Sequence, residues 1–206
     1  MAAEREFDNA LAIFPNYHLA FAGKARARLA AGDADAAIEF YQRAWERVPL
    51  PETATALGDL YTKLGRAEEA KKQYDLVEFI ERTGAVAGTY SRQLALFYAD
   101  HDVKLDEALA IALRERAARA DIYTSDTLAW CLYKKGDLAG AKRTIDEALR
   151  LGTRDARLHY HAGMIEQALG NRRDAAKHLQ LALKINPSFD ILQADVARQT
   201  LRAIAV

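Results

Sequence analysis

A glycine recurs along this chain at a nearly constant distance, and that period constrains the fold more than any other feature of the sequence. Gly32 and Gly65 lie 33 residues apart, and Gly136 and Gly170 lie 34 residues apart. Each glycine ends an apolar-periodic stretch of helical length, and each is followed five positions later by a small residue. These small residues are Ala37, Ala70, Ala141 and Ala175. A fixed period of this length predicts a row of similar structural units that stack on one another.

Each period has the layout of two helices joined by a tight turn. Glycine closes the first helix because it adopts the left-handed backbone conformation without steric cost, and small residues on the second helix let neighbouring helices approach closely. Second helices end near Pro15, Pro49 and Pro187, since proline cannot continue the hydrogen-bond ladder of a helix. The expected helices cover residues 17–31, 34–47, 52–64, 67–82, 88–100, 104–119, 123–135, 138–151, 156–169 and 172–185.

The third period departs from this layout. The stretch Gly84-Ala-Val-Ala-Gly88 predicts an inserted loop, and Asp100-His101-Asp102 stands where the turn glycine belongs. Aspartate and histidine tolerate the left-handed conformation better than most residues do. Glu115 occupies a position at which the other periods place a small residue. This period therefore matches the repeat least well.

The residues at the repeated positions resemble those of a known family, the tetratricopeptide repeat (TPR) proteins. The best-matching units carry Leu57-Gly58, Tyr61, Gly65, Ala70 and Tyr74; Leu128-Ala129, Leu132, Gly136, Ala141 and Ala148; and Gly163, Leu169-Gly170, Ala175, Leu179, Ala182 and Asn186-Pro187. The resemblance implies an all-α fold, a TPR-type right-handed helical solenoid of about five helix-turn-helix repeats with a C-terminal capping helix. It divides a single array over residues 1–206 into a partial repeat at 1–15, repeats at 16–50, 51–84, 88–121, 122–155 and 156–188, and a capping helix at 189–206.

The two ends of the array need separate interpretations. Phe7, Ala10 and Pro15 fit the second helix of a repeat whose first helix is absent. We interpret this half-repeat as the cut end of a longer array in preference to a cap, because an unpaired second helix exposes an apolar face that a cap should hide. Residues 189–203 predict one more amphipathic helix, with Ser188 as its N-cap.

No pattern of residues predicts a catalytic centre or a metal site. The sequence has no glycine-rich phosphate loop, nucleophile elbow or His-Glu-x-x-His motif. His159 and His161 point about 200° apart on one helix, and His161 could meet His178 only across two helices, with no third ligand. Cys131 is interpreted as a small buried residue, because no acid or base is evident beside it. We therefore expect a chain that is not an enzyme and holds no metal or cofactor.

Composition narrows the classes of partner. The 29 basic residues balance the 29 acidic residues, so the formal net charge is zero. A neutral chain has no general attraction for nucleic acid or anionic lipid. The sequence contains no stretch of about eighteen uncharged apolar residues, which is the length that a membrane-spanning helix needs. We expect neither a nucleic-acid partner nor a membrane span, and the cytoplasm is the favoured compartment for this segment.

The TPR resemblance places function on the first helices of the repeats, which line a concave groove in such arrays. Positions 2, 5, 6, 9, 12 and 13 of each repeat face that groove. No pair at positions 5 and 9 matches the lysine and asparagine of chaperone-binding TPR domains, so the acidic tail of a chaperone is not the expected ligand. The expected partner-binding residues, chiefly from the last repeats, are Arg92, Tyr123, Asp126, Trp130, Tyr133, Lys134, Arg157, Tyr160, His161 and Met164.

These features predict a non-enzymatic scaffold that binds a protein or peptide in its groove, chiefly in the C-terminal half. One alternative is self-association, in which the terminal helices pack between copies and give a homo-oligomer. Another is a regulatory or docking role within a larger multidomain protein. The identity of the partner does not follow from the sequence.

Two positions test the register of the repeats. Leu128, Ala129 and Leu132 fill the core positions around Trp130, so the helical period turns the indole toward the groove. We expect Trp130→Ala to weaken partner binding and to leave the helical fold intact. Gly163 occupies the small position where the two helices of one repeat meet, and overpacking there by Gly163→Leu is expected to cost about 1–3 kcal/mol.

Overall fold

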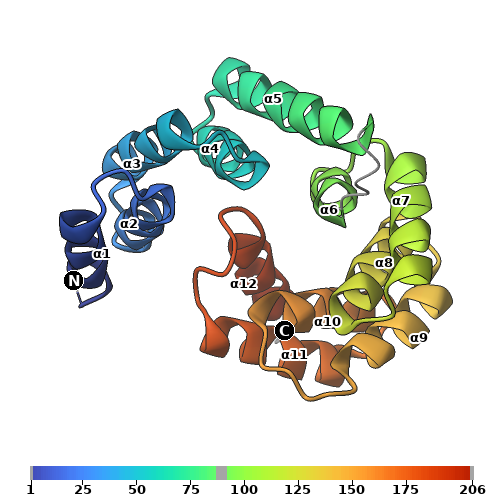
Figure 1. Cartoon of the computed structure of the whole chain (residues 1–206). Helices are drawn as coiled ribbons and strands as arrows, with labels where there is room; N and C mark the ends of the chain where they lie inside the picture. The colour runs from blue at the N-terminus through green and yellow to red at the C-terminus, as the bar shows by residue number, and fades with distance from the viewer. Residues whose placement is uncertain (1, 87–91, 205–206) are drawn as a thin grey trace. The chain divides into compact units, whose positions relative to one another are not determined.

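The computed structural model describes residues 2–86 and 92–204, and every regular element within these ranges is an α-helix (Figure 1). The helices are α1 (Ala2–Ile13), α2 (His18–Ala30), α3 (Ala34–Arg47), α4 (Pro51–Lys63), α5 (Ala67–Val86), α6 (Arg92–Asp100), α7 (Leu105–Ala118), α8 (Ile122–Lys134), α9 (Leu138–Leu149), α10 (Ala156–Ala168), α11 (Arg172–Ile185) and α12 (Gln193–Ile204). The all-α fold predicted from the sequence is confirmed, and most helix ends lie within two residues of their expected positions.

The chain divides into two compact units, Met1–Arg82 and Thr83–Val206. The boundary coincides with the point at which the sequence departs from its repeat pattern. Unit 1 holds α1 to α4 and most of α5, and unit 2 holds α6 to α12. The two units are described separately below.

Consecutive helices pair as helix-turn-helix repeats. In unit 1 α2 packs against α3, and in unit 2 α6, α8 and α10 pack against α7, α9 and α11. The four turn glycines, Gly32, Gly65, Gly136 and Gly170, have φ angles of 86°, 74°, 85° and 82°, which is the left-handed conformation expected of them. In the third repeat Asp102 takes that role with a φ of 55°. Aspartate therefore replaces glycine at this turn, as predicted.

Several helices begin at an aspartate that caps their free backbone amides. The side chains of Asp33, Asp121, Asp137 and Asp155 each accept a hydrogen bond from a backbone N–H of the first turn. Such a cap satisfies a donor that has no partner within the helix. These aspartates therefore mark the starts of α3, α8, α9 and α10 in the sequence.

Small residues on the second helices lie in the core, as the period predicts. Both small positions of each well-matched repeat are at most 4% exposed, namely Ala37, Ala44, Ala70, Val77, Ala141, Ala148, Ala175 and Ala182. In the third repeat Ala108 is fully buried, and Glu115 at the second small position is 4% exposed. The Glu115 carboxylate accepts a hydrogen bond from the Arg119 guanidinium, which compensates for its burial.

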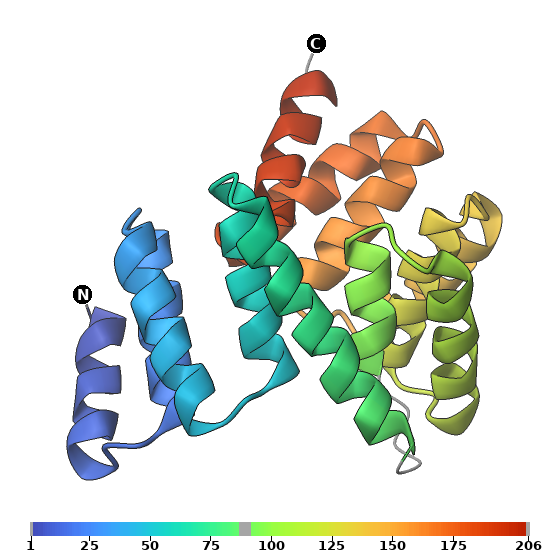
Figure 2. The same cartoon turned by 90° about the horizontal axis from the view of Figure 1, so that it is seen from above.

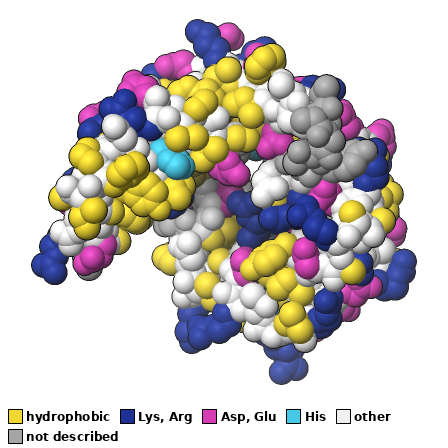
Figure 3. Space-filling view, viewed as in Figure 1, with side chains coloured by type: hydrophobic (Ala, Val, Ile, Leu, Met, Phe, Trp, Pro, Cys, Tyr) yellow, Lys and Arg dark blue, Asp and Glu magenta, His cyan; other side chains and the backbone are white. Residues whose placement is uncertain are grey.

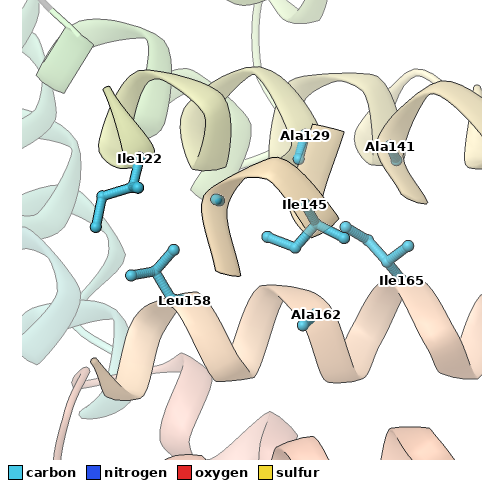
Figure 4. Packing of buried hydrophobic residues seen from close by; sticks show 8 residues of the cluster. Ile122, Ala129, Ala141, Ile145, Leu158, Ala162 and Ile165 are labelled. Carbon is cyan, nitrogen blue, oxygen red and sulfur yellow. The ribbon is translucent and has the colours of Figure 1, made fainter. Parts of the chain in front are cut away.

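The core of unit 2 is formed where one repeat stacks on the next. Figure 4 shows side chains of α8, α9 and α10 meeting in one apolar cluster. The cluster consists of Ile122, Ala129, Ala141, Ile145, Ala148, Leu158, Ala162 and Ile165. Leu179 of α11 is fully buried and lies against Gly163 of α10. Small residues thus allow the close approach of helices that carry leucine and isoleucine.

The structure corrects two predicted boundaries. Helix α5 continues to Val86, so Gly84 belongs to the helix and not to a loop. Residues 87 and 88 of the expected loop lie outside the described residues, and so do residues 88–91 of the next expected helix. At the C-terminus the helix begins at Gln193, and residues 187–192 form turns. Asp190, and not Ser188, supplies the cap, because its Oδ1 accepts the amides of Leu192 and Gln193, each at 2.9 Å.

The N-terminal helix α1 packs on α2 within unit 1. The Phe7 ring lies against the backbone of Gly23, so closely that a side chain at this glycine would collide with it. Two ion pairs join the same helices, from Arg28 to Glu4 at 2.6 Å and from Lys24 to Asp8 at 2.5 Å. Residues 2–13 therefore form a helix that packs on α2, and the assignment of residues 1–15 to a partial repeat stays a prediction.

Candidate functional site

The predicted partner-binding residues all lie on the first helices of unit 2. In Figure 1, α6, α8 and α10 occupy one side of this unit, and α7, α9 and α11 occupy the other. Helix α8 packs against both α6 and α10. We call the side formed by α6, α8 and α10, with the residues at the groove positions of the repeat, the first-helix face.

Trp130 lies at the centre of this face, but it is buried. Its side chain is 1% exposed and is stacked between two other rings. The indole is 4.8 Å from the Tyr133 ring, with an interplanar angle of 15°, and 4.2 Å from the His161 ring, with an angle of 14°. Tyr160 adds a tilted contact at 5.6 Å. The prediction that the indole faces an open groove is therefore wrong.

The burial of Trp130 follows from neighbours that the helical period of α8 cannot reveal. Its indole Nε1 donates a hydrogen bond of 2.8 Å to Oδ1 of Asp100, at the end of α6. A polar ring edge with such a partner can lie in the core without a desolvation penalty. Asp100 occupies position 13 of the third repeat, and we did not select it from the sequence. Position 13 is one of the groove positions of a TPR repeat, so applying those positions to the whole of the third repeat would have identified Asp100.

Three further predicted groove residues are also buried. The Nδ1 atom of His161 lies 2.8 Å from Oδ1 of Asp126, and the two residues are 0% and 2% exposed. Tyr160 is 3% exposed, and burial, with a contribution from Asp100, raises the pKa of its hydroxyl group. These side chains link α8 to α10. They form part of the core beneath the first-helix face and do not form its polar rim.

The accessible part of the face carries cationic groups beside aromatic rings. Tyr123 is 41% exposed, and the guanidinium of Arg92 lies 5.5 Å from the centroid of its ring. Lys134 is half-buried, with its Nζ 5.0 Å from the Trp130 ring and 2.9 Å from both carboxylate oxygens of Asp102. Cation–π contacts of this kind stabilise by about 0.5–1 kcal/mol at exposed sites.

Arg157 completes this cationic set and is the most strongly coupled of its members. Its guanidinium lies 3.3 Å from Asp190 and 3.9 Å from Asp100. Burial lowers the pKa of Arg157, but the carboxylates of Asp100 and Asp190 outweigh it and raise the net value. The side chain is still 39% exposed. Arg157 therefore stays charged and reachable from solvent.

The C-terminal segment contacts the same face. The Phe189 ring lies 5.2 Å from the Tyr160 ring, and Nε2 of Gln193 donates a hydrogen bond of 2.5 Å to Oδ1 of Asp100. Farther along α12, the Thr200 hydroxyl lies 3.7 Å from the sulfur of Met164. Met164 and Tyr133 are half-buried. The face that the sequence predicts as open is thus partly covered by residues 189–200 of the same chain.

Two of the histidines form a pair across α10 and α11. His159, and not His161, meets His178: their Nδ1 atoms are 3.0 Å apart and their rings are stacked at 5.3 Å. Within the described residues, no group of three or more His, Cys, Asp or Glu side chains is placed to hold a metal ion. Cys131 is 1% exposed, and burial raises the pKa of its thiol to about 12. A thiol with this pKa is not a reactive nucleophile at neutral pH.

The histidine pair predicts that acid destabilises unit 2. Burial lowers the pKa of His159 below the ordinary value of 6.5, with His178 adding to the shift and Asp155 opposing it. Burial also lowers the pKa of His178, with Lys142 adding to the shift and the acidic neighbours Glu166, Asp174 and Asp146 opposing it. The unfolded chain then binds more protons than the folded chain, so stability falls as the pH drops through about 6.5. We expect the melting temperature of the wild type to decrease from about pH 7.5 to about pH 5. The melting temperature of His178→Gln should decrease less steeply over the same range. Equal slopes of melting temperature against pH in the two proteins would contradict the prediction.

The fold and its first-helix face define a helical-repeat array, a class of protein that uses extended surfaces for binding. Two family models, both described as tetratricopeptide repeat, match residues 28–88 and 156–189. The chain is a tetratricopeptide repeat protein. No curated protein sequence matches it.

Solved structures support the same fold. A tetratricopeptide repeat protein from Parabacteroides merdae is 17% identical with a TM-score of 0.61, over 98% of this chain and 77% of that one. A thermophilic TPR protein from Thermus thermophilus is 18% identical with a TM-score of 0.56, over 90% and 99% of the two chains. A chain of the APC/C hetero-tetramer Cut9-Hcn1 is 19% identical with a TM-score of 0.54, over 96% of this chain but only 39% of that one.

The surface of the described residues carries both signs of charge. Figure 3 shows acidic and basic side chains interspersed with apolar patches over the visible face. Among the described residues, no helix is both long enough and apolar enough to cross a membrane. With charges mixed in this way, recognition depends on local pairs of groups more than on a field of one sign.

Proposed function

We propose that this chain is a protein-interaction scaffold that binds a peptide segment of a partner on the first-helix face of unit 2. TPR arrays are typically scaffolds without enzymatic activity, and repeat proteins bind partners along extended surfaces. Among the structural relatives, Cut9-Hcn1 is by its description part of a hetero-tetramer. These points support the class of function, and the residues on the face support its location.

The observation that carries the location is the accessible pair of Arg92 and Tyr123. Arg92 is the first residue of α6, Tyr123 is the second residue of α8, and Arg157 is the second residue of α10. Three successive first helices therefore present an aromatic ring and two guanidinium groups. Exposed aromatic and arginine side chains are the types that most often dominate binding energy at interfaces.

The face favours a ligand with acidic and aromatic groups. The guanidinium groups of Arg92 and Arg157 pair well with carboxylates, and Tyr123 offers a flat apolar surface. Asp126, Trp130 and His161 hold the helices together beneath this surface and do not themselves meet solvent, whereas the buried Tyr160 lies against the Phe189 ring of the C-terminal segment. The partner would therefore contact Arg92, Tyr123, Tyr133, Lys134, Arg157 and Met164.

A substitution at Tyr123 tests this proposal. The immobilised chain is used to capture partners, and each captured protein is then titrated against the wild type and against Tyr123→Ala. We expect Tyr123→Ala to weaken binding at least tenfold, or by about 1.4 kcal/mol, because it removes the ring and the partner of Arg92. Leu113→Ala is the matched control, since Leu113 is 51% exposed on α7, on the other side of the unit. Equal affinities for the three proteins would contradict the use of this face.

A further inference from the structure

The C-terminal residues of unit 2 do more than cover the last repeat. Helix α12 packs against α11, with Ala194 and Ala197 buried, and this contact is sufficient for a cap. Figure 2 shows α12 running at an angle to α10 and α11, with the C-terminus at its far end. The turn that precedes α12 and the first residue of that helix make a different set of contacts, which are specific and mostly polar.

Each of these contacts is made to a groove position of the first-helix face. Asp190 meets Arg157, Phe189 meets the Tyr160 ring, and Gln193 donates to Asp100. Arg157, Tyr160 and Asp100 occupy positions 2, 5 and 13 of their repeats, where a TPR array is expected to meet its ligand. A capping helix has no need of contacts at these positions.

We infer that residues 189–193, with the sequence Phe-Asp-Ile-Leu-Gln, occupy in cis a site that also accepts a partner peptide with an aromatic residue followed by an acidic one. This inference rests on the proposed function and names the chemistry of its ligand. The aromatic residue stacks on Tyr160, and the acidic residue pairs with Arg157. Binding of the partner then requires that residues 189–193 leave the face.

The occupant in cis has an imperfect fit, which makes its displacement feasible. Oε1 of Gln193 is buried and has no hydrogen-bond partner in the described structure. Asp190 is largely buried, with 11% of its side chain exposed, but its partner Arg157 is 39% exposed. An unpaired buried acceptor costs free energy, and water that reaches the guanidinium of Arg157 weakens its ion pair with Asp190. The segment therefore competes mainly through its high effective concentration, since only a few residues connect it to α11.

Competition between the two occupants can be measured with a synthetic peptide. The probe is a fluorescein-labelled peptide of residues 186–196, titrated by anisotropy against the full chain and against the double variant Phe189→Ala/Asp190→Asn. Asparagine is chosen because it preserves the cap at the start of α12 while it removes the charge that faces Arg157. We expect the double variant to bind the peptide at least tenfold more tightly than the wild type, because its own segment no longer competes.

Two controls establish specificity. A peptide that carries the same two substitutions should lose the tenfold gain, and so should the double variant when Arg157→Ala is added. Equal affinity of the wild type and the double variant for the unmodified peptide would overturn the inference. A gain that persists with the substituted peptide would overturn it as well. Circular dichroism of each variant checks that the helical content is unchanged.

A second measurement needs no substitution. Hydrogen exchange of the wild-type chain is followed with a saturating, isotopically labelled peptide, and the amides of residues 191–196 should exchange faster when the peptide displaces them. Unchanged exchange at saturation would contradict displacement. If sedimentation shows a wild-type dimer that becomes a monomer in the double variant, the segment is exchanged between two copies and the assignment in cis is wrong.

The outcomes of this test and of the test at Tyr123 are separable. If a captured partner depends on Tyr123 but binds the wild type and the double variant equally, the scaffold function stands and the occupant in cis is rejected. If the peptide competes as expected but no partner depends on Tyr123, the site at Arg157 and Tyr160 stands and the proposed contact at Arg92 and Tyr123 is rejected.

Discussion

Replacing Trp130 by alanine is expected to lower the free energy of unfolding of unit 2 by about 3–5 kcal/mol, the usual cost of removing a buried aromatic ring. The indole is stacked between Tyr133 and His161, and its Nε1 bonds to Asp100. Its loss leaves a cavity between three successive first helices and removes one donor from a carboxylate. Urea unfolding followed by circular dichroism measures the effect.

Trp130→Phe separates the ring from the hydrogen bond. Phenylalanine keeps most of the stacking surface but cannot donate to Asp100, which would retain Gln193 and Arg157 as partners. We expect a loss of about 1.5–3 kcal/mol, the range for a hydrogen bond to a charged group. Wild-type stability in Trp130→Ala would mean that the indole lies on an open surface, as the helical period alone suggests.

Gly163→Leu is expected to destabilise unit 2 by about 3 kcal/mol, at the upper end of the overpacking range. A Cβ atom at Gly163 would lie 2.6 Å from Cγ and 2.7 Å from Cδ2 of Leu179, and 3.2 Å from the backbone nitrogen of that residue. Leu179 is fully buried, and a helix backbone cannot move away as a flexible side chain can. Helices α10 and α11 must therefore separate to admit the new side chain.

Gly84→Ala is the matched control for this substitution. Gly84 also lies within a helix, but a Cβ atom there has no neighbour within 4 Å. Alanine is favoured over glycine in a helix by about 0.5–1 kcal/mol, so this variant should be slightly more stable than the wild type. Thermal melting of the two variants should show shifts of opposite sign. A melting temperature of Gly163→Leu equal to that of the wild type would show that the register of the fifth repeat is wrong.

Local chemistry explains why the repeat, its register and the helix ends could be predicted. A turn that needs a left-handed residue selects glycine or aspartate, as at Gly136 and Asp102. A helix contact that permits only a small side chain selects alanine or glycine, as at Ala141 and Gly163. These constraints act within one repeat and recur at a fixed spacing. The helical periodicity and the TPR family could therefore be predicted without tertiary information.

Local constraints of this kind do not explain the structure of the C-terminal turn. The apolar residues from Phe189 onward have helical spacing, but the first of them form turns and contact α10. A cap at Ser188 would start the helix about two residues earlier than a cap at Asp190 does. The carboxylate of Asp190 serves as the cap and also lies beside Arg157. A contact between residues 33 positions apart thus decides where α12 begins.

The sequence by itself determined the all-α class, the helix-turn-helix repeats and a set of side chains on the first helices of unit 2. Only the tertiary structure decided which members of that set are accessible. The helical period assigns Trp130 to the groove side of α8, and the indole does point away from the cluster around Ala129. The indole is buried because the His161 ring of α10 stacks on it and Asp100 of α6 accepts its N–H, and Asp100 in turn meets Gln193, 93 residues away in the chain. Burial depends on such distant neighbours, and a periodic pattern within one helix carries no information about them.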